Sequence, residues 1–213
     1  SEILRIEGAT GDYLDDAFIR LNMINSSEFT YTIDKGLDYY SESYLFDLNV
    51  SSFYISSIPI NNTYHTILEV KFHEQVGIKD ILIDTHYFTF GTTRTFRGTP
   101  TGIKVYSSIF EDHYKLAAFF VGDPVYPMTR IKYTFPNDLQ CDKLKLEFVH
   151  VTMQSQVGKS YSLLLSEIYF IKGLIRPTQT LEPTETPTST PTPSNSPSLS
   201  PSMSPSFSPS SSP

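Results

Sequence analysis

The feature that most restricts the fold is a pair of strand-like runs at residues 143–148 and 162–171. In the first run, Leu144, Leu146 and Phe148 alternate with charged residues, which is the pattern of a strand with one buried face. The second run is apolar on both faces over most of its length, which is typical of a strand buried on both sides. A polar, turn-forming segment at residues 154–160 separates them. We therefore expect a β-hairpin that closes a domain.

Glu167 interrupts the second run. A carboxylate inside a buried strand has to be ion-paired, hydrogen-bonded or bound to a metal, because desolvating it alone costs too much free energy. Two interpretations stay open for Glu167. It belongs to a metal site, or it is satisfied by a salt bridge or by backbone hydrogen bonds.

The composition of residues 1–176 also indicates β structure. These residues contain 28 of the 29 aromatic residues, and aromatic side chains favour half-buried pleated surfaces. Further strands are expected at residues 67–72, 78–84, 102–106, 115–121 and 130–135, separated by turns rich in Gly, Pro, Asn and Asp. No helical pattern is long enough to connect parallel strands, so the sequence predicts an all-β, antiparallel sandwich or barrel over residues 37–176.

Residues 1–36 are expected to pack on this sandwich or to extend it. Alternation at residues 19–23 and 29–33 predicts two strands. An amphipathic helix over residues 13–24 is the alternative for the first of them.

The composition changes at residue 177. Residues 177–213 hold ten of the fifteen prolines, with Ser and Thr in most other positions. Such a segment cannot bury enough apolar surface to fold, and its prolines favour an extended polyproline II conformation. The composition is that of an O-glycosylated stalk, with a bare linker as the alternative. The predicted O-glycosylation sites are Thr184, Thr186, Thr188, Thr190, Thr192, Ser198, Ser202 and Ser206.

Three sequons, at Asn25, Asn49 and Asn61, predict N-glycosylation. The single cysteine, Cys141, excludes an intrachain disulfide and by itself favours a reducing compartment. The sequons and the mucin-like tail outweigh it, so we expect a secreted or cell-surface protein. The longest apolar run, residues 116–121, is too short to span a membrane.

Charge and motifs exclude two classes of function. The net charge is −7 with no basic cluster, which argues against nucleic acid as a partner. His73 and Glu74 begin a zinc-protease motif, but Gly77 stands where the second histidine is required. The five histidines are dispersed, and we expect no enzyme activity.

The order of several segments resembles the discoidin, or coagulation-factor type C, domains of the galactose-binding-like superfamily. The segments are residues 45–54, 68–72, 81–83 and 100–108, followed by 163–170 with its Leu-Ser-Glu-Ile pattern. The resemblance implies an eight-stranded jelly-roll sandwich. It also implies a non-catalytic domain that binds glycans, or sometimes lipids or proteins, through loops at one end.

Two sets of site residues follow from this resemblance. A structural calcium ion would be held by Asp47, Asn49, Ser52 and Glu167, although Leu48 stands where the family has glycine and a glycan on Asn49 would compete with the metal. A sugar would be bound by Arg94 and Arg97 in the loop of residues 86–101, with His86, Tyr87 and Tyr161 as platforms. The chain has no tryptophan, and Tyr54 occupies a place where the family often has one.

The sequence therefore predicts an extracellular, non-catalytic module for glycan binding or adhesion, displayed on a glycosylated stalk. Its expected partner is a glycan or a cell-surface glycoprotein. One alternative is a structural protomer that self-associates into an extracellular glycoprotein filament or coat. A further alternative is the accessory binding module of a larger enzyme.

Overall fold

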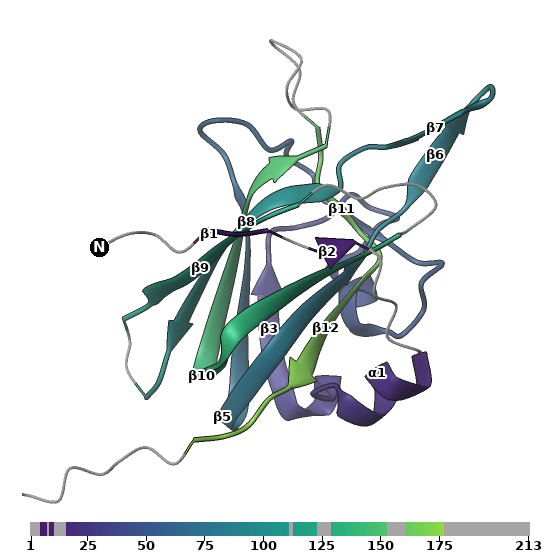
Figure 1. Ribbon diagram of the computed structural model, residues 1–213. Helices are drawn as coiled ribbons and strands as arrows, with labels where there is room; N and C mark the ends of the chain where they lie inside the picture. The colour runs from purple at the N-terminus through teal and green to yellow at the C-terminus, as the bar shows by residue number, and fades with distance from the viewer. Residues whose placement is uncertain are drawn as a thin grey trace, which may run out of the picture. The chain divides into compact units, whose positions relative to one another are not determined.

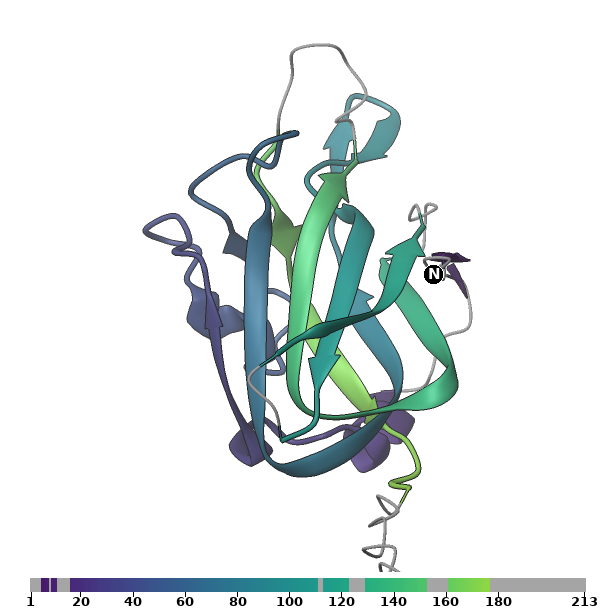
Figure 2. The same cartoon turned by 90° about the vertical axis from the view of Figure 1, so that its left-hand side faces the viewer.

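Two long strands, β5 (Thr66–Asp84) and β10 (Arg130–Val151), run antiparallel to each other through the whole domain in the computed structural model (Figure 1). Each strand bends near its middle, and their pairing shifts register between Thr134 and Leu139 and again between Cys141 and Lys143. Because of these bends, the two halves of each strand lie in opposite layers of a β-sandwich (Figure 2).

The structure describes residues 5–7, 9–10, 16–110, 113–122, 129–152 and 161–176. For residues 5–7, 9–10, 88, 90, 94 and 95, only the backbone is described. The compact unit to which these ranges belong ends at Pro177, so the predicted stalk and its O-glycosylation sites lie outside the described residues.

The first layer contains the first half of β5 and the second half of β10. Strand β3 (Phe29–Ile33) pairs with β5, while β8 (Pro100–Ser108) pairs with β10 and β9 (Lys115–Val121) pairs with β8, all antiparallel. A short parallel strand, β1 (Arg5–Glu7), adds to β9. Buried and exposed residues alternate along this half of β5, which fits one face in the core and one face in solvent.

The second layer contains the other halves of β5 and β10. Strand β12 (Glu167–Lys172) pairs with β5, and β2 (Ala9–Thr10) pairs with β10. Short elements complete the domain: α1 (Asp16–Asn22), the 3-10 helices η1 (Ser26–Glu28) and η2 (Glu42–Phe46), the pair β4 (Tyr54–Ile55) and β11 (Leu164–Leu165), and the hairpin β6 (Tyr87–Phe90) and β7 (Thr93–Phe96).

Aromatic side chains fill much of the space between the layers. Phe29 packs edge-to-face on Phe46, Phe72 and Phe170, with ring centroids 5.0, 5.7 and 5.8 Å apart. This geometry adds to the free energy of apolar burial. The predicted all-β, antiparallel jelly-roll sandwich is confirmed.

Residues 19–23 do not form the predicted strand. They belong mostly to α1, in which residues four apart lie on the same face. Ile19 and Met23 have this spacing, and both are buried. That face packs on the outside of the second layer, against Leu82, Tyr169 and Ile171. Since α1 covers β12 from outside, residues 167–171 are buried on both faces, as their continuous apolar pattern predicted.

The two runs that dominate the sequence do not form a hairpin, so this prediction is wrong. Residues 143–148 and β12 both pair with β5, but they pair with different halves of it. The two runs therefore lie in different layers. None of the helices in the described ranges is long and apolar enough to cross a membrane.

Candidate functional site

A groove of about 870 Å³ opens at the end of the sandwich where β5 finishes and β10 begins. One wall comes from the loop after η2, with Val50 and Phe53, and another from His86 and Tyr87 at the start of β6. The groove thus lies among end loops on a rigid β scaffold, where binding residues are often found.

Three rings lie next to one another at this groove. The rings of His86 and Tyr87 are nearly parallel, with an interplanar angle of 9° and centroids 5.9 Å apart. The ring centroid of Phe53 lies 5.5 Å from that of His86, and the two rings are tilted by 38°. His86 is exposed and Tyr87 is half-buried, so the pair of rings is accessible from solvent. Flat aromatic surfaces of this kind pack on the apolar face of a pyranose ring.

Polar residues line the same groove. Arg130 donates from Nε to Asp84 Oδ1 over 2.6 Å and from Nη2 to Asp84 Oδ2 over 2.8 Å. Asp16 Oδ1 lies 3.4 Å from Nη2 of the same guanidinium. The guanidinium carbon of Arg130 lies 5.5 Å from the ring centroid of Tyr169. Asp84 is almost fully buried, and the paired geometry keeps its charge satisfied there.

The four predicted calcium ligands come together in the neighbouring loop. The backbone N–H of Asn49 donates to Asp47 Oδ1 over 2.8 Å and to Glu167 Oε1 over 3.0 Å. The hydroxyl of Ser52 lies 2.8 Å from Asp47 Oδ2 and 2.7 Å from the carbonyl oxygen of Asn49. The loop thus brings Asp47 against the end of β12, far away in sequence.

The two carboxyl groups of this cluster have opposite pKa shifts. Burial, and then the adjacent Asp47, raises the pKa of Glu167 to about 8. Burial also opposes ionisation of Asp47, but hydrogen bonds involving Glu167, Ser52 and the Asn49 amide outweigh it and lower the pKa of Asp47. Two carboxyl groups in contact need a shared proton or a cation between them.

Two further observations make this cluster suitable for a hard cation. The second carboxyl oxygen of Glu167, Oε2, is buried and has no hydrogen-bond partner in the described part of the chain. Leu48 has a φ of 62°, which turns the loop so that the Asn49 amide faces both carboxylates. Carboxylate, carbonyl and hydroxyl oxygens are the ligands that Ca²⁺ prefers, so the residues present fit this ion.

The remaining predicted sugar-binding residues lie elsewhere or outside the described atoms. Arg97 is half-buried beside Gly98, which has a φ of 69° and no room for a Cβ, because Ser162 O would lie 2.3 Å away. Tyr161 packs against the core, and its carbonyl oxygen accepts from the Ile60 amide over 3.0 Å. Neither lines the groove. The side chain of Arg94 lies outside the described atoms, on the hairpin that replaces the predicted open loop.

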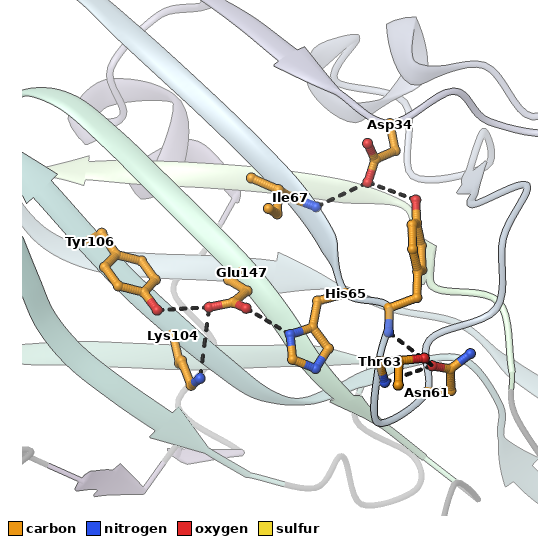
Figure 3. A network of polar contacts seen from close by, with 9 residues as sticks. Asp34, Asn61, Thr63, His65, Ile67, Lys104, Tyr106 and Glu147 are labelled. Atoms are coloured by element: carbon orange, nitrogen blue, oxygen red, sulfur yellow. Dashed lines mark hydrogen bonds and ion pairs between the residues drawn. The ribbon is translucent and has the colours of Figure 1, made fainter. Parts of the chain in front are cut away.

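The three sequon asparagines have different surroundings. Asn25 and Asn49 are exposed, and Asn61 is half-buried. Asn61 Oδ1 accepts hydrogen bonds from the Thr63 amide and hydroxyl and from the Tyr64 amide, each over 2.8 Å, as Figure 3 shows for Thr63.

Sequence reasoning missed Phe53, Asp84 and Arg130. The signal for the last two is present, since each is a charged residue at the end of an apolar strand, 46 residues from its partner. Their pairing could not be read from sequence, because it depends on which strands are neighbours in the sheet.

Similarity to solved structures decides the fold. The two CBM32 domains of ZmpB from Clostridium perfringens superpose with a TM-score of 0.61 at 16% identity, over 81% of this chain and 42% of that one. The domain has the fold of a family 32 carbohydrate-binding module. The family 32 module of C. perfringens NanJ, solved with galactose, has this CBM32 fold at a TM-score of 0.52 and 16% identity, over 70% of this chain and 97% of that one.

The CBM32 fold also matches a third module, CBM32-3 from a family 31 glycoside hydrolase of C. perfringens, with a TM-score of 0.57 and 11% identity over 75% of this chain and 100% of that one. The present chain spans about two fifths of the two-domain ZmpB structure. No family model and no curated protein matches the sequence. The galactose-binding-like architecture expected from the order of sequence segments is confirmed.

Proposed function

We propose that this domain is a non-catalytic glycan-binding module and that a galactose-type sugar binds in the groove beside His86, Tyr87 and Phe53. The observation that carries the proposal is the group of three contacting rings that line a groove large enough for a small glycan. Two modules that share the fold were solved with galactose or with GalNAc, which supports this sugar class.

The groove suggests how the sugar lies. The His86 and Tyr87 rings pack on the apolar face of the pyranose, and polar groups that line the groove hydrogen-bond its hydroxyls. Arg130 and Asp84 keep a fixed geometry through their ion pair, so the polar wall is rigid before the sugar arrives. A rigid wall loses little conformational entropy on binding.

Calorimetric titration with galactose and GalNAc, with glucose as the comparison sugar, tests the proposal. We expect Tyr87→Ala and His86→Ala each to weaken binding about tenfold, which corresponds to about 1.4 kcal/mol. Tyr39→Ala is the matched control, because this tyrosine is 88% exposed and does not line the groove. Equal affinity of all three variants would contradict the proposal, as would a lack of binding to either sugar.

The two loop arginines require their own variants. If the sugar also reaches β7, Arg94→Ala and Arg97→Ala weaken binding as well. If neither changes the affinity while Tyr87→Ala does, the site is restricted to the described groove.

We also propose that a calcium ion binds between Asp47 and Glu167 and has a structural role. Asp47, Glu167, Ser52 and the carbonyl oxygen of Asn49 would hold it, and its charge would compensate the two carboxylates. The support is the contact between the two carboxyl groups and the buried, unpartnered Oε2 of Glu167. The ion would fasten the loop that carries Phe53 to the end of β12.

The wider setting of the module is a proposal too. We infer extracellular display from the three sequons and the composition of residues 177–213. One comparison favours a role as the accessory module of a larger enzyme. A ZmpB structure that contains the same fold also contains an M60 catalytic domain, and this chain covers 17% of that structure's chain.

A further inference from the structure

The outer face of the first layer has a charge composition unlike the rest of the protein. Along β5, β8 and β10, every second residue between the buried core positions points to this face. Its charged members are the lysines 71, 104, 143 and 145 and the glutamates 69 and 147. Of the residues whose side chains the structure describes, four of the nine lysines but only two of the 14 acidic residues are on this face.

Two of these lysines lie directly opposite each other. The register of β5 and β10 pairs Lys71 with Lys143, and Lys145 lies two residues further along the same face. Like charges at directly opposed positions of an antiparallel pair are destabilising. An anion bound across this pair would be attracted by both ammonium groups.

The next position on this face combines a cation with aromatic rings. Lys145 Nζ lies 4.8 Å from the ring centroid of Tyr106 on β8 and 4.6 Å from that of Tyr114. Both rings are partly exposed. They provide flat surfaces beside the lysines, and such surfaces suit pyranose rings.

Local contacts offset the negative charges of this face. Glu147 accepts a hydrogen bond from the Tyr106 hydroxyl over 2.8 Å, lies 2.7 Å from His65 Nδ1 and lies 3.8 Å from Lys104 Nζ (Figure 3). Glu69 is opposite Lys145 in the register of β5 and β10. At the border, Asp142 Oδ1 accepts from the Phe110 amide over 3.0 Å.

From this arrangement we propose that the outer face of the first layer is a second binding site, which takes a chain of acidic sugars. Sulfate or carboxylate groups of the chain lie against Lys71, Lys143 and Lys145, and a pyranose ring lies on Tyr114 or Tyr106. The site is on strands rather than on end loops, and none of its residues lines the groove proposed above. It is therefore independent of the groove.

Binding of dextran sulfate to the purified chain, with uncharged dextran and polyglutamate as comparison polymers, tests this site. We expect dextran sulfate to bind, with an affinity that falls as salt rises because exposed charges are screened. We expect uncharged dextran not to bind and polyglutamate to bind at least tenfold more weakly. Equal binding of polyglutamate would show a general polyanion surface and would overturn the assignment to acidic sugars.

A matched pair of double variants separates this face from net charge. Lys71→Ala with Lys143→Ala should weaken dextran sulfate binding about tenfold, which corresponds to a few tenths to 1 kcal/mol for each exposed charge. Lys35→Ala with Lys79→Ala removes the same charge from exposed positions elsewhere and should change it less than about twofold. Equal effects of the two double variants would overturn the proposal.

Two further readouts keep the result interpretable. Tyr114→Ala should also weaken dextran sulfate binding, since charge alone does not explain a contribution from the ring. The Lys71/Lys143 double variant should keep its thermal unfolding midpoint and its affinity for galactose, if the groove binds that sugar. If the double variant unfolds at a lower temperature and this explains the lost binding, the second site is overturned. If galactose does not bind at all, only the proposal for the groove is contradicted.

Discussion

Arg130 and Asp84 are joined by two hydrogen bonds, of 2.6 and 2.8 Å, at the place where β10 begins and β5 ends. Beside them, the Thr85 amide and hydroxyl both donate to the carbonyl oxygen of Thr129, over 2.6 and 2.8 Å. His86 follows Thr85 directly in the sequence. One ring of the candidate groove is therefore attached to a strand end that is held by both the Asp84 and the Thr85 contacts.

Arg130→Ala should be strongly destabilising. It leaves Asp84 buried without its cation, and breaking one partner of such a pair typically costs about 3–5 kcal/mol. Urea unfolding measures the change. Replacing both residues, as in Arg130→Met with Asp84→Leu, should recover a large part of the loss, because the unpaired charge is gone. A single variant that costs less than about 1 kcal/mol would contradict the importance of the pair.

Leu48 is held at a φ of 62°, a conformation that costs a bulky residue free energy. At this position Leu48→Gly should be more stable than Leu48→Ala by roughly 1 kcal/mol, the reverse of the order in ordinary segments. Both variants lack the contacts of the leucine side chain, so their difference in stability reports mainly on the backbone conformation. Thermal denaturation of the two variants side by side gives the answer, and an alanine variant of equal stability would refute the strain.

Calcium should raise the unfolding midpoint of the wild-type chain after treatment with a chelator. If the ion binds only the folded state, about 2.7 kcal/mol of stabilisation is expected at a concentration 100 times the dissociation constant. Glu167→Gln should abolish the calcium effect, since it removes one of the two carboxylates. Glu147→Gln serves as a control for removing a carboxylate elsewhere, and it should respond to calcium like the wild type.

Glu147 should make stability depend on acidity. Burial opposes its ionisation, but hydrogen bonds from His65 and Tyr106 and the charge of Lys104 outweigh it and lower its pKa below the ordinary 4.5. A lowered folded-state pKa means that the stabilisation is present above about pH 4.5 and is lost as the pH falls through the folded-state value.

The matching experiment compares the wild type with Glu147→Gln. The difference in unfolding free energy should be on the order of 1 kcal/mol near neutral pH and should shrink below pH 4.5. Glu69→Gln on the adjacent strand is a control for removing a charge from the same face. A wild-type advantage that persists at low pH would contradict the ionised Glu147 network.

Chain made in a eukaryotic secretory pathway should be heavier than its sequence mass. Asn25 is exposed and Asn61 is partly so, and Asn25→Gln and Asn61→Gln should each remove one N-glycan from the intact mass. A residual excess after enzymatic removal of N-glycans would come from O-linked sugars on residues 177–213. An unmodified mass would contradict the glycosylated stalk.

The β-sandwich was predictable because its core strands alternate in polarity at the period of a pleated sheet. Residues 67–72 and 143–148 show this pattern, and both are strands of the first layer. The same rule failed at residues 19–23, where Ile19 and Met23 fit a strand and a helix equally well in so short a segment. Packing on Leu82 and Tyr169 decides for the helix, and a local pattern does not contain that contact.

The resemblance to discoidin domains brought Asp47, Asn49, Ser52 and Glu167 together as one candidate cluster. Glu167 was also conspicuous by itself, as a carboxylate within an apolar run, and the structure places it against the loop of the other three. His86 and Tyr87 are adjacent in the sequence, and the resemblance named both, but a strand pattern does not predict that their rings stack. Phe53 and Arg130 reach the groove through tertiary packing, which neither composition nor spacing reveals.

The bent strands have a consequence for how this domain comes apart. Because β5 and β10 each belong to both layers, neither layer can separate while the other stays intact. We therefore expect one sharp loss of structure in denaturant, with the sheet that carries the lysines and the end that carries the rings melting at the same midpoint.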